Sequence, residues 1–494
     1  MLITLIRRIT VAEEGNMKSL VKNSLFNALY QVLNMIFPLI SSIYVARTLM
    51  PEGVGRVAYA QNIASYFVTA AALGIPTVGV RAISNARDDK EKLNRTFSEL
   101  TIINACSTLL SLAFYLVLVF CNPAFLADCQ LYFAAGLVIL FNAINIDWLY
   151  QGNEEYAYIV VRSILMKIVS LLALFLFVKE KDDYIIYAII SSLAICGNYV
   201  FNAIRARKYV TLQFFDLNLQ QHIKPVFLFA GTLFFAAIYS KVDTTMLGAM
   251  VGEESVAFYS YAHKVLHIGV GFCAAVTTAF LPRLSYYFQK DKEQFFALVA
   301  QGVQIIAFLS IPAATGLFIL APEAIDLLFG RTFLPAAQTL RIFSVLIIIF
   351  AFGNLMCYQM MICSGNEKKH VVVLASAAGI NVILNVLLIP KLQHNGAAVA
   401  SVITELFINV VEGLYFTHLL KLKFDWQVIK QAVLSSGIMG AILAVTKFFA
   451  NGTILSFIFS VSIGIVVYIS MNILLKNRFT MNAVYVIQKK MMKR

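Results

Sequence analysis

The stretch FFAAIYSKVDTTMLGAM, residues 234–250, decides the fold class. Its apolar residues continue without the alternation of a barrel strand, which predicts a helix that crosses a membrane. Most of the chain is similar, because hydrophobic residues make up 60% of the 494, charged residues make up 13%, and the mean hydropathy is +0.79. The sequence therefore predicts an all-α integral membrane protein.

About 14 transmembrane helices are predicted from the apolar blocks and from the polar, proline and glycine residues between them. They lie near 22–47, 54–80, 97–121, 130–150, 156–178, 184–205, 223–248, 255–281, 295–320, 335–363, 370–389, 396–419, 428–449 and 453–475. Basic residues collect in the tails and in alternate hinges, as at 81–95, 205–208, 283–292 and 476–494. Because the cytoplasmic side is the more basic one, both termini are expected in the cytoplasm. This topology explains the net charge of +13 without a nucleic acid partner.

An internal repeat divides the chain into two halves. DKEKLNRTF from Asp89 and DKEQFFALV from Asp291 are separated by 202 residues, as are PEGVGRVAYAQNI from Pro51 and EESVAFYSYAHKV from Glu253. QGNEEY from Gln151 returns as SGNEKK at a separation of 213. Six helices in each half predict two lobes related by an axis along the membrane normal, with a substrate path between them. The predicted parts are an N-terminal extension at 1–16, lobes at 17–210 and 211–425, and two extra helices with a basic cytoplasmic tail at 426–494.

Charged residues inside the apolar blocks are candidate functional residues. A charge near the bilayer centre costs from ~2.5 to more than ~10 kcal/mol unless it faces a cavity or a partner. Asp243 is the clearest case, because its side chain is too short to reach the interface. Lys241 lies on the opposite side of the helix, so Lys264 on the next span is the expected partner, and a brace without a transport role is the alternative. The basic candidates for a cavity are Arg162, Lys167, Lys241, Lys264 and Arg341.

Other polar residues suggest ion coupling. His263 and His267 have the spacing of two metal ligands on one helix face, but no third ligand is near, so no metal is expected. Proton coupling beside a carboxylate is the alternative to simple packing. Glu405 shares a helix face with Glu412 and is a further candidate for ion coupling. The chain shows no Walker A, GxSxG or paired-carboxylate pattern, which predicts neither an enzyme nor a bound cofactor.

Five stretches together resemble the Wzx-type polysaccharide repeat-unit flippases: LISSIYVARTLMPEGVGRVAYAQNIASYF (39–67), LGIPTVGVRAIS (73–84), FSEL (97–100), DWLYQGNEEY (147–156) and KVDTTMLGAMVGEESVAFYSYAHKV (241–265). The resemblance implies a bacterial inner-membrane protein that moves undecaprenyl-pyrophosphate-linked oligosaccharide across the bilayer by alternating access. It implies a cationic central cavity, coupling to H⁺ or Na⁺, and a polysaccharide polymerase and chain-length regulator as further candidate partners. It also brings attention to Arg47, Asp243 and Lys264 at motif positions.

Two other function classes stay open. A pyrophosphate needs fixed positive charge, which Arg and Lys supply, so deep cations favour an anionic cargo. An ion-coupled multidrug exporter of cationic compounds is the alternative, and it requires a cavity of carboxylates and aromatic residues. A membrane enzyme such as a repeat-unit polymerase requires a long external loop, which the hinges are too short to supply.

Overall fold

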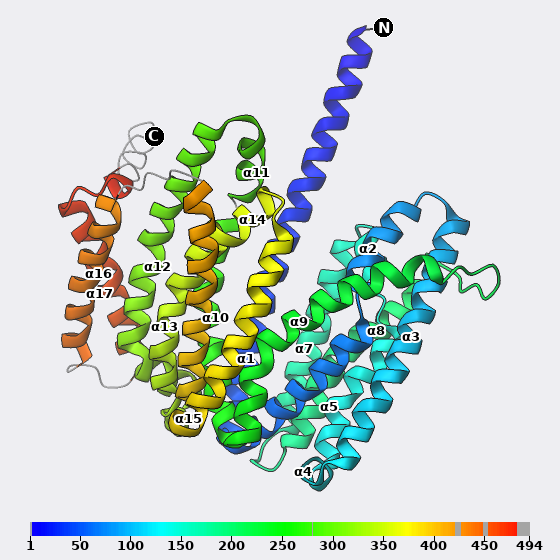
Figure 1. Ribbon diagram of the computed structural model, residues 1–494, viewed down its shortest axis with the longest axis horizontal. Coiled ribbons are helices and arrows are strands. Elements are labelled where there is room, and N and C mark those ends of the chain that lie inside the picture. Colours follow the sequence, from blue (N-terminus) through cyan, green and yellow to red (C-terminus); the bar gives the residue numbers. More distant parts are fainter. Residues whose placement is uncertain (1, 279, 420–425, 448–452, 482–494) are drawn as a thin grey trace. The chain divides into compact units, whose positions relative to one another are not determined.

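The computed structural model describes residues 2–278, 280–419, 426–447 and 453–481. Throughout these residues the regular structure is helical. The chain divides into two compact units, Met1–Ile238 and Tyr239–Arg494, which are described separately (Figure 1). The lobe and tail boundaries predicted above stay a prediction.

The N-terminal unit is built around the first long helix. Its elements are α1 (Leu2–Ala72), α2 (Ile75–Ala86), α3 (Lys90–Cys121), α4 (Pro123–Ala127), α5 (Cys129–Phe141), the short η1 (Asn142–Ile144), α6 (Asp147–Gly152), α7 (Tyr156–Phe177) and α8 (Tyr184–Ala206). Helix α9 (Gln220–Met250) begins in this unit. Within the unit, α1 contacts α3, α5, α7 and α8, and α5 packs on α8.

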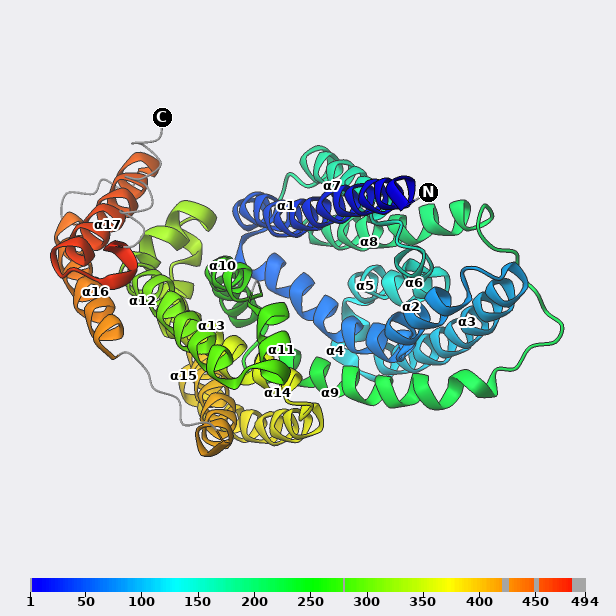
Figure 2. The same cartoon turned by 90° about the horizontal axis from the view of Figure 1, so that it is seen from above.

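The C-terminal unit contains the end of α9 and all later elements. These are α10 (Glu253–Thr278), α11 (Leu281–Lys290), α12 (Lys292–Phe329), η2 (Arg331–Phe333), α13 (Ala336–Gly353), the π-helical η3 (Asn354–Gln359), α14 (Met360–Cys363), α15 (Glu367–Leu419), α16 (Trp426–Thr446) and α17 (Ile454–Leu474). Figure 2 shows α16 and α17 beside α12, where Tyr468 Oη donates to the carbonyl of Phe308 at 2.8 Å.

Ten helices in the described residues are long and apolar enough to cross a membrane, so the chain is a multi-pass membrane protein. Two of these stretches, 36–86 and 368–415, contain a break where Met50 (φ 60°) and Gln393 (φ 51°) leave the helical conformation. The predicted helix boundaries near 50 and near 393 therefore coincide with real interruptions of the backbone. The predicted number of about 14 transmembrane helices stays a prediction.

Both units have a backbone break and an aspartate helix cap at equivalent positions of the repeat. The break at Met50 has its counterpart at Gly252 (φ 122°), which follows the end of α9 at the separation of 202 residues seen in the sequence. Asp89 caps α3 by accepting the N–H groups of residues 91 and 92, and Asp291 caps α12 by accepting the N–H of residue 294. An aspartate at this position satisfies donors that a helix start leaves open. The repeated DKE sequences are therefore helix starts.

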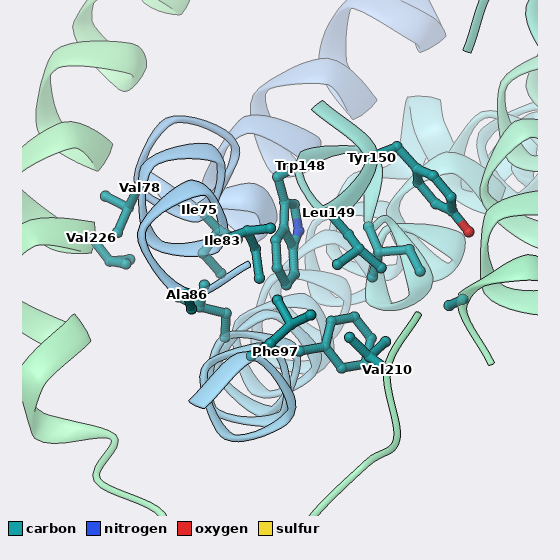
Figure 3. Packing of buried hydrophobic residues seen from close by; sticks show 14 of the residues in the cluster. Ile75, Val78, Ile83, Ala86, Phe97, Trp148, Leu149, Tyr150, Val210 and Val226 are labelled. Carbon is teal, nitrogen blue, oxygen red and sulfur yellow. The ribbon is translucent and has the colours of Figure 1, made fainter. Parts of the chain in front are cut away.

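A buried cluster in the N-terminal unit fixes the short helix α6. Figure 3 shows Trp148 among Ile83, Leu149 and Phe97, and the rings of Trp148 and Phe97 are 5.7 Å apart. Gly79 on α2 makes this possible, since a Cβ there would lie 2.8 Å from the indole ring. The packing of α6 holds the residue before Trp148, which is Asp147, at a defined place.

The segment that follows α8 is bound to α3 of the same unit. The side chains of Asn94 and Ser98 accept the backbone N–H groups of residues 211 and 213 at 2.9 and 2.8 Å. Glu99, which is fully buried, accepts the N–H of Asn218 at 2.6 Å and contacts Gln221 and His222 at 2.7 and 2.8 Å. These three side chains therefore determine the course of the segment.

Candidate functional site

A polar pocket of about 340 Å³ lies between α1, α7 and α8 of the N-terminal unit. We call it the basic pocket, because Arg162 and Lys167 of α7, two of the predicted cavity residues, line it together with Asp147. Its other lining residues include Phe37, Pro38, Ser41, Ser163, Ser170, Tyr187, Ser191, Asn198 and Tyr199. The structure therefore brings these two predicted cations together.

Arg162 is held by two neighbours. Its Nη1 lies 3.1 Å from Asp147 Oδ1 and also donates to Asn202 Oδ1, while Asn202 Nδ2 donates to Asp147 Oδ1. The side chain of Arg162 is 5% exposed and that of Asp147 is 35% exposed, and both residues line the basic pocket. Arg162 Nε is buried and has no hydrogen-bond partner among the described residues. One donor of the guanidinium is thus left for another acceptor.

Lys167 adds a second positive charge to the basic pocket. Its Nζ is 5.9 Å from the centre of the Phe37 ring, at the outer limit of a cation–π contact. Arg162 and Lys167 together outnumber the one carboxylate in the lining. A pocket with surplus donors and surplus positive charge can hold an anion such as a phosphate group.

Asp243 on α9 is buried, 7% exposed, and surrounded by neutral donors. Asn385 Nδ2 donates to its Oδ1 at 2.6 Å, and Tyr259 Oη and Ser401 Oγ donate to its Oδ2 at 2.6 and 2.5 Å. Among the described residues these are its partners, so the expected pair with Lys264 is wrong. Lys264 lies five residues after Tyr259 on α10, which turns it roughly 140° away from the face that meets Asp243.

Glu405 on α15 lies one turn from Ser401 and accepts a hydrogen bond from Tyr239, which is one turn from Asp243 on α9. Because Asp243 meets Ser401 and Tyr239 meets Glu405, the end of α9 and the second part of α15 run antiparallel. Two predicted ion-coupling residues, Asp243 and Glu405, thus share one seam within the C-terminal unit. In the part of the chain that the structure describes, the hydrogen-bond partners of Asp243 and Glu405 include no Lys or Arg.

Glu412 continues this line two turns beyond Glu405. Its side chain is fully buried, Oε1 lies 2.5 Å from Nδ1 of His370, and Oε2 has no partner among the described residues. Glu405, Glu412 and His370 all line a cavity of about 230 Å³, which we call the inner cavity. We call Asp243, Glu405 and Glu412 the acidic line. Buried carboxylates without cationic partners are costly unless they bind a proton or another cation.

His263 and His267 adjoin the acidic line through Tyr259. The rings of Tyr259 and His263 are stacked with centroids 6.0 Å apart, and the rings of His263 and His267 are 4.3 Å apart edge to face. Within the described part of the chain, no group of three or more His, Cys, Asp or Glu residues is arranged to hold a metal ion.

The other four predicted cavity residues lie outside both polar groups. Arg47 is exposed on α1, and Lys241 is half-buried on α9. Lys264 Nζ lies 4.1 Å from the centre of the Tyr261 ring. Arg341 Nη1 donates to Gln338 Oε1, 3.4 Å away on the same helix. Their role in substrate binding stays a prediction.

Sequence reasoning missed the neutral partners and one histidine: Asn202, Tyr239, Tyr259, His370, Asn385 and Ser401. The clearest overlooked signal is the pair Asn381 and Asn385, one helical turn apart inside an apolar block, where polar amides require partners. His370 follows two lysines, so its position resembles a surface hinge rather than a buried site.

Two family models and several known proteins match this chain. The model of the family described as polysaccharide biosynthesis protein matches residues 20–288, and the MatE family model matches residues 229–387. The chain is 23% identical over 397 residues to a protein of Escherichia coli (strain K12) named "Putative O-antigen transporter", covering 80% of this chain and 96% of that protein. It is 23% identical over 421 residues to a capsular polysaccharide biosynthesis protein of Staphylococcus aureus, covering 80% and 99%.

Solved structures share the fold at low sequence identity. The lipid II flippase MurJ in an inward closed conformation has a TM-score of 0.75 at 16% identity, covering 92% of this chain and all of that one. An inward-facing multidrug resistance transporter of the MATE family has a TM-score of 0.62 at 15% identity, covering 77% and 93%.

Proposed function

Since this chain belongs to the polysaccharide biosynthesis protein family, we propose that it is a flippase for lipid-linked oligosaccharide. Its cargo would be undecaprenyl-pyrophosphate-linked repeat units, moved across the bacterial inner membrane for assembly of a surface polysaccharide. Both termini would lie in the cytoplasm, as the distribution of Lys and Arg predicts. The names of relatives from E. coli and S. aureus support this class of cargo.

The basic pocket is the observation that carries the proposal. A diphosphate loses its hydration when it leaves water, so it requires positive charge and N–H donors fixed in advance. Arg162 offers an unused Nε–H, and Lys167 offers an ammonium group in the same pocket. Asp147 and Asn202 hold the guanidinium in place, so little side-chain entropy is lost when the anion binds.

The acidic line would bind the coupling ion, H⁺ or Na⁺. Asp243 has only neutral donors as partners in the described residues, and Asn385 Oδ1 beside it is a buried acceptor without a partner. A cation at this place would satisfy both the carboxylate and the amide oxygen. Transport would then follow the ion gradient by alternating access, and a polymerase and a chain-length regulator would act on the delivered units.

A strain that lacks its own flippase tests the proposal when it is complemented with this chain. We expect wild type to restore surface polymer and Arg162→Gln to leave lipid-linked units on the cytoplasmic face, measured by their protection from a periplasmic glycan-modifying enzyme. Equal exposure of the units in wild type and in the empty-vector strain would contradict a flippase.

A multidrug exporter of cationic compounds is the second candidate. The acidic line with Tyr239 and Tyr358 near the inner cavity is the kind of lining that this function requires. Resistance to cationic dyes that depends on Glu405, without any effect on surface polymer, would favour it over the flippase.

A further inference from the structure

Glu412 lines two separate spaces in the C-terminal unit. One is the inner cavity, and the other is a groove of about 550 Å³ lined by Met361, Lys368, Lys369, Val372, Val373, Val411 and Tyr415. We call the second space the lysine groove. His370, which contacts Glu412, also lines the inner cavity. The pair His370–Glu412 is thus part of the wall between the two spaces.

The contact within this pair requires a proton. A separation of 2.5 Å between His370 Nδ1 and Glu412 Oε1 is a short hydrogen bond, so one of the two atoms must carry the hydrogen. The glutamate side chain is fully buried and lines both spaces, while the histidine side chain is 19% exposed and lines the inner cavity. Glu412 Oε2 remains free of protein partners in the described residues.

We propose that His370 and Glu412 form a proton-exchange site through which Glu405 gains and loses protons from the lysine groove. This inference rests on the proposed function, in which the acidic line binds the coupling ion, and it identifies that ion as a proton. An alkali cation suits the pair poorly, because hard cations prefer oxygen ligands and one member of the pair is an imidazole nitrogen.

The transfer is balanced in protons and charge. A hydronium ion in the groove gives a proton to Glu412 Oε2, which makes the acid neutral, while His370 Nδ1–H stays bonded to Oε1. Glu412 then gives a proton through cavity water to the Glu405 carboxylate, so Glu412 is again ionised and Glu405 becomes neutral. His370 keeps its Nδ1 proton throughout, and the same steps in reverse return a proton to the groove.

The inner cavity has room for the water that this path requires. At ~30 Å³ for each molecule, its volume accommodates about eight waters. Glu405 and Glu412 are seven residues apart on α15, which is about 10 Å along the helix axis, so a short chain of water joins them. Asn354 and Asn409 supply further polar groups to the lining.

Other ionisable groups face the pair from each neighbouring element. They are Tyr239 of α9, Cys357 and Tyr358 of η3, and Lys368, Lys369, Glu405 and Tyr415 of α15. Lys369 Nζ donates to Tyr415 Oη at 2.5 Å, which keeps a positive charge at the groove without an ion pair to Glu412. The π-helical η3 contributes Asn354 and Cys357 to the cavity wall, and such segments are frequent at functional sites.

The test uses the purified full-length protein and no glycan. After a rapid pH jump, infrared spectroscopy follows the carbonyl band of neutral carboxylic acids, and Glu405→Gln identifies the band of Glu405. We expect Glu412→Gln to slow the titration of that band roughly 100-fold, the scale of a lost proton-transfer group. His370→Gln should slow it less, because His370 orients the Glu412 carboxylate and does not carry the proton. Glu323→Gln is the matched control, because Glu323 pairs with Lys447 at 3.0 Å in another pocket of the same unit.

The outcomes separate this inference from the proposed function. An unchanged titration rate in both variants, with wild-type thermal stability, would overturn the exchange site whatever the cargo is. A Glu405 band that responds to Na⁺ at constant pH would overturn the assignment of the proton. Slow titration together with normal surface polymer in the same variants would support the exchange site and contradict proton coupling of the flippase.

Discussion

The two units share a repeated scaffold and differ in the charged residues of their polar sites. Met50 and Gly252 interrupt the chain at equivalent positions, and Asp89 and Asp291 start equivalent helices. In the N-terminal unit the polar pocket holds Arg162 and Lys167 against one carboxylate, whereas the C-terminal unit holds the acidic line with no Lys or Arg partner in the described residues. The helix ends and breaks are therefore repeated in both units, while the charges of the polar sites differ between them.

The largest effect is expected in the basic pocket. Arg162→Gln should reduce surface polymer to background, because truncating one partner of a buried charge pair costs about 2–5 kcal/mol. Surface polymer and membrane protein level are both measured, and Arg87→Gln serves as the control, since Arg87 is exposed and pairs with the exposed Glu154. The double variant Asp147→Asn/Arg162→Gln removes the unpaired acid, and polymer restored by it would show that Arg162 is merely a brace.

The second-largest loss of surface polymer is expected from a substitution in the acidic line. Asp243→Asn should lower surface polymer and abolish its dependence on the ion gradient at an unchanged protein level. Asn can still accept from Tyr259 and Ser401, so the free energy of unfolding should change by about 1 kcal/mol at most. Polymer yield and the thermal midpoint of the purified variant check this. Full polymer yield in Asp243→Asn would count against a coupling role.

A graded effect is expected among three lysines. Lys167→Ala should impair polymer export most, because it removes charge from the basic pocket. Lys264→Ala should have a smaller effect, since its contact with the Tyr261 ring is worth about 0.5–2 kcal/mol. Lys430→Ala at the exposed start of α16 should have the least effect. Equal losses in all three would remove the distinction between pocket and surface charges.

The smallest effect tests the shared scaffold. Asp89→Ala and Asp291→Ala should each lower the free energy of unfolding by about 0.5–2 kcal/mol. Asp89→Ala should cost more, because Asp89 accepts two backbone N–H groups and Asp291 accepts one. Thermal unfolding in detergent measures both, with exposed Asp88→Ala as the neighbouring control. A cost in one unit alone would mean that the DKE repeats are not equivalent.

The sequence predicts the membrane fold and the presence of a buried acid, and it misses what surrounds that acid. Apolar blocks are local signals. Asp243 stands out because a lone carboxylate in such a block must face a cavity or a partner. Its partners Asn385 and Ser401 lie 142 and 158 residues away and are neutral, so no charge pattern identifies them. The wrong choice of Lys264 came from matching opposite charges at similar depth without knowing which face of α10 meets α9.

Arg162 and Lys167 were predicted by the same rule, and the structure adds the partners that restrain Arg162. Asn202, which accepts a hydrogen bond from Arg162, lies on the next helix, and nothing in the sequence distinguishes it from other polar residues. The pair His370–Glu412 is equally hard to predict from the sequence, because its members are 42 residues apart and His370 follows two lysines. Polar contacts between helices depend on how the helices face one another, and periodicity alone does not determine that.

The binding of the segment after α8 to Glu99 has a consequence for synthesis of the chain. Thr211, Gln213, Asn218 and His222 find their partners on α3, which has already been made when they leave the ribosome. The first unit can therefore satisfy its own polar groups before the second unit is translated, in keeping with domains that fold in order from the N-terminus. Nascent chains truncated shortly after residue 238 should already resist proteolysis, while chains that end before residue 210 should not.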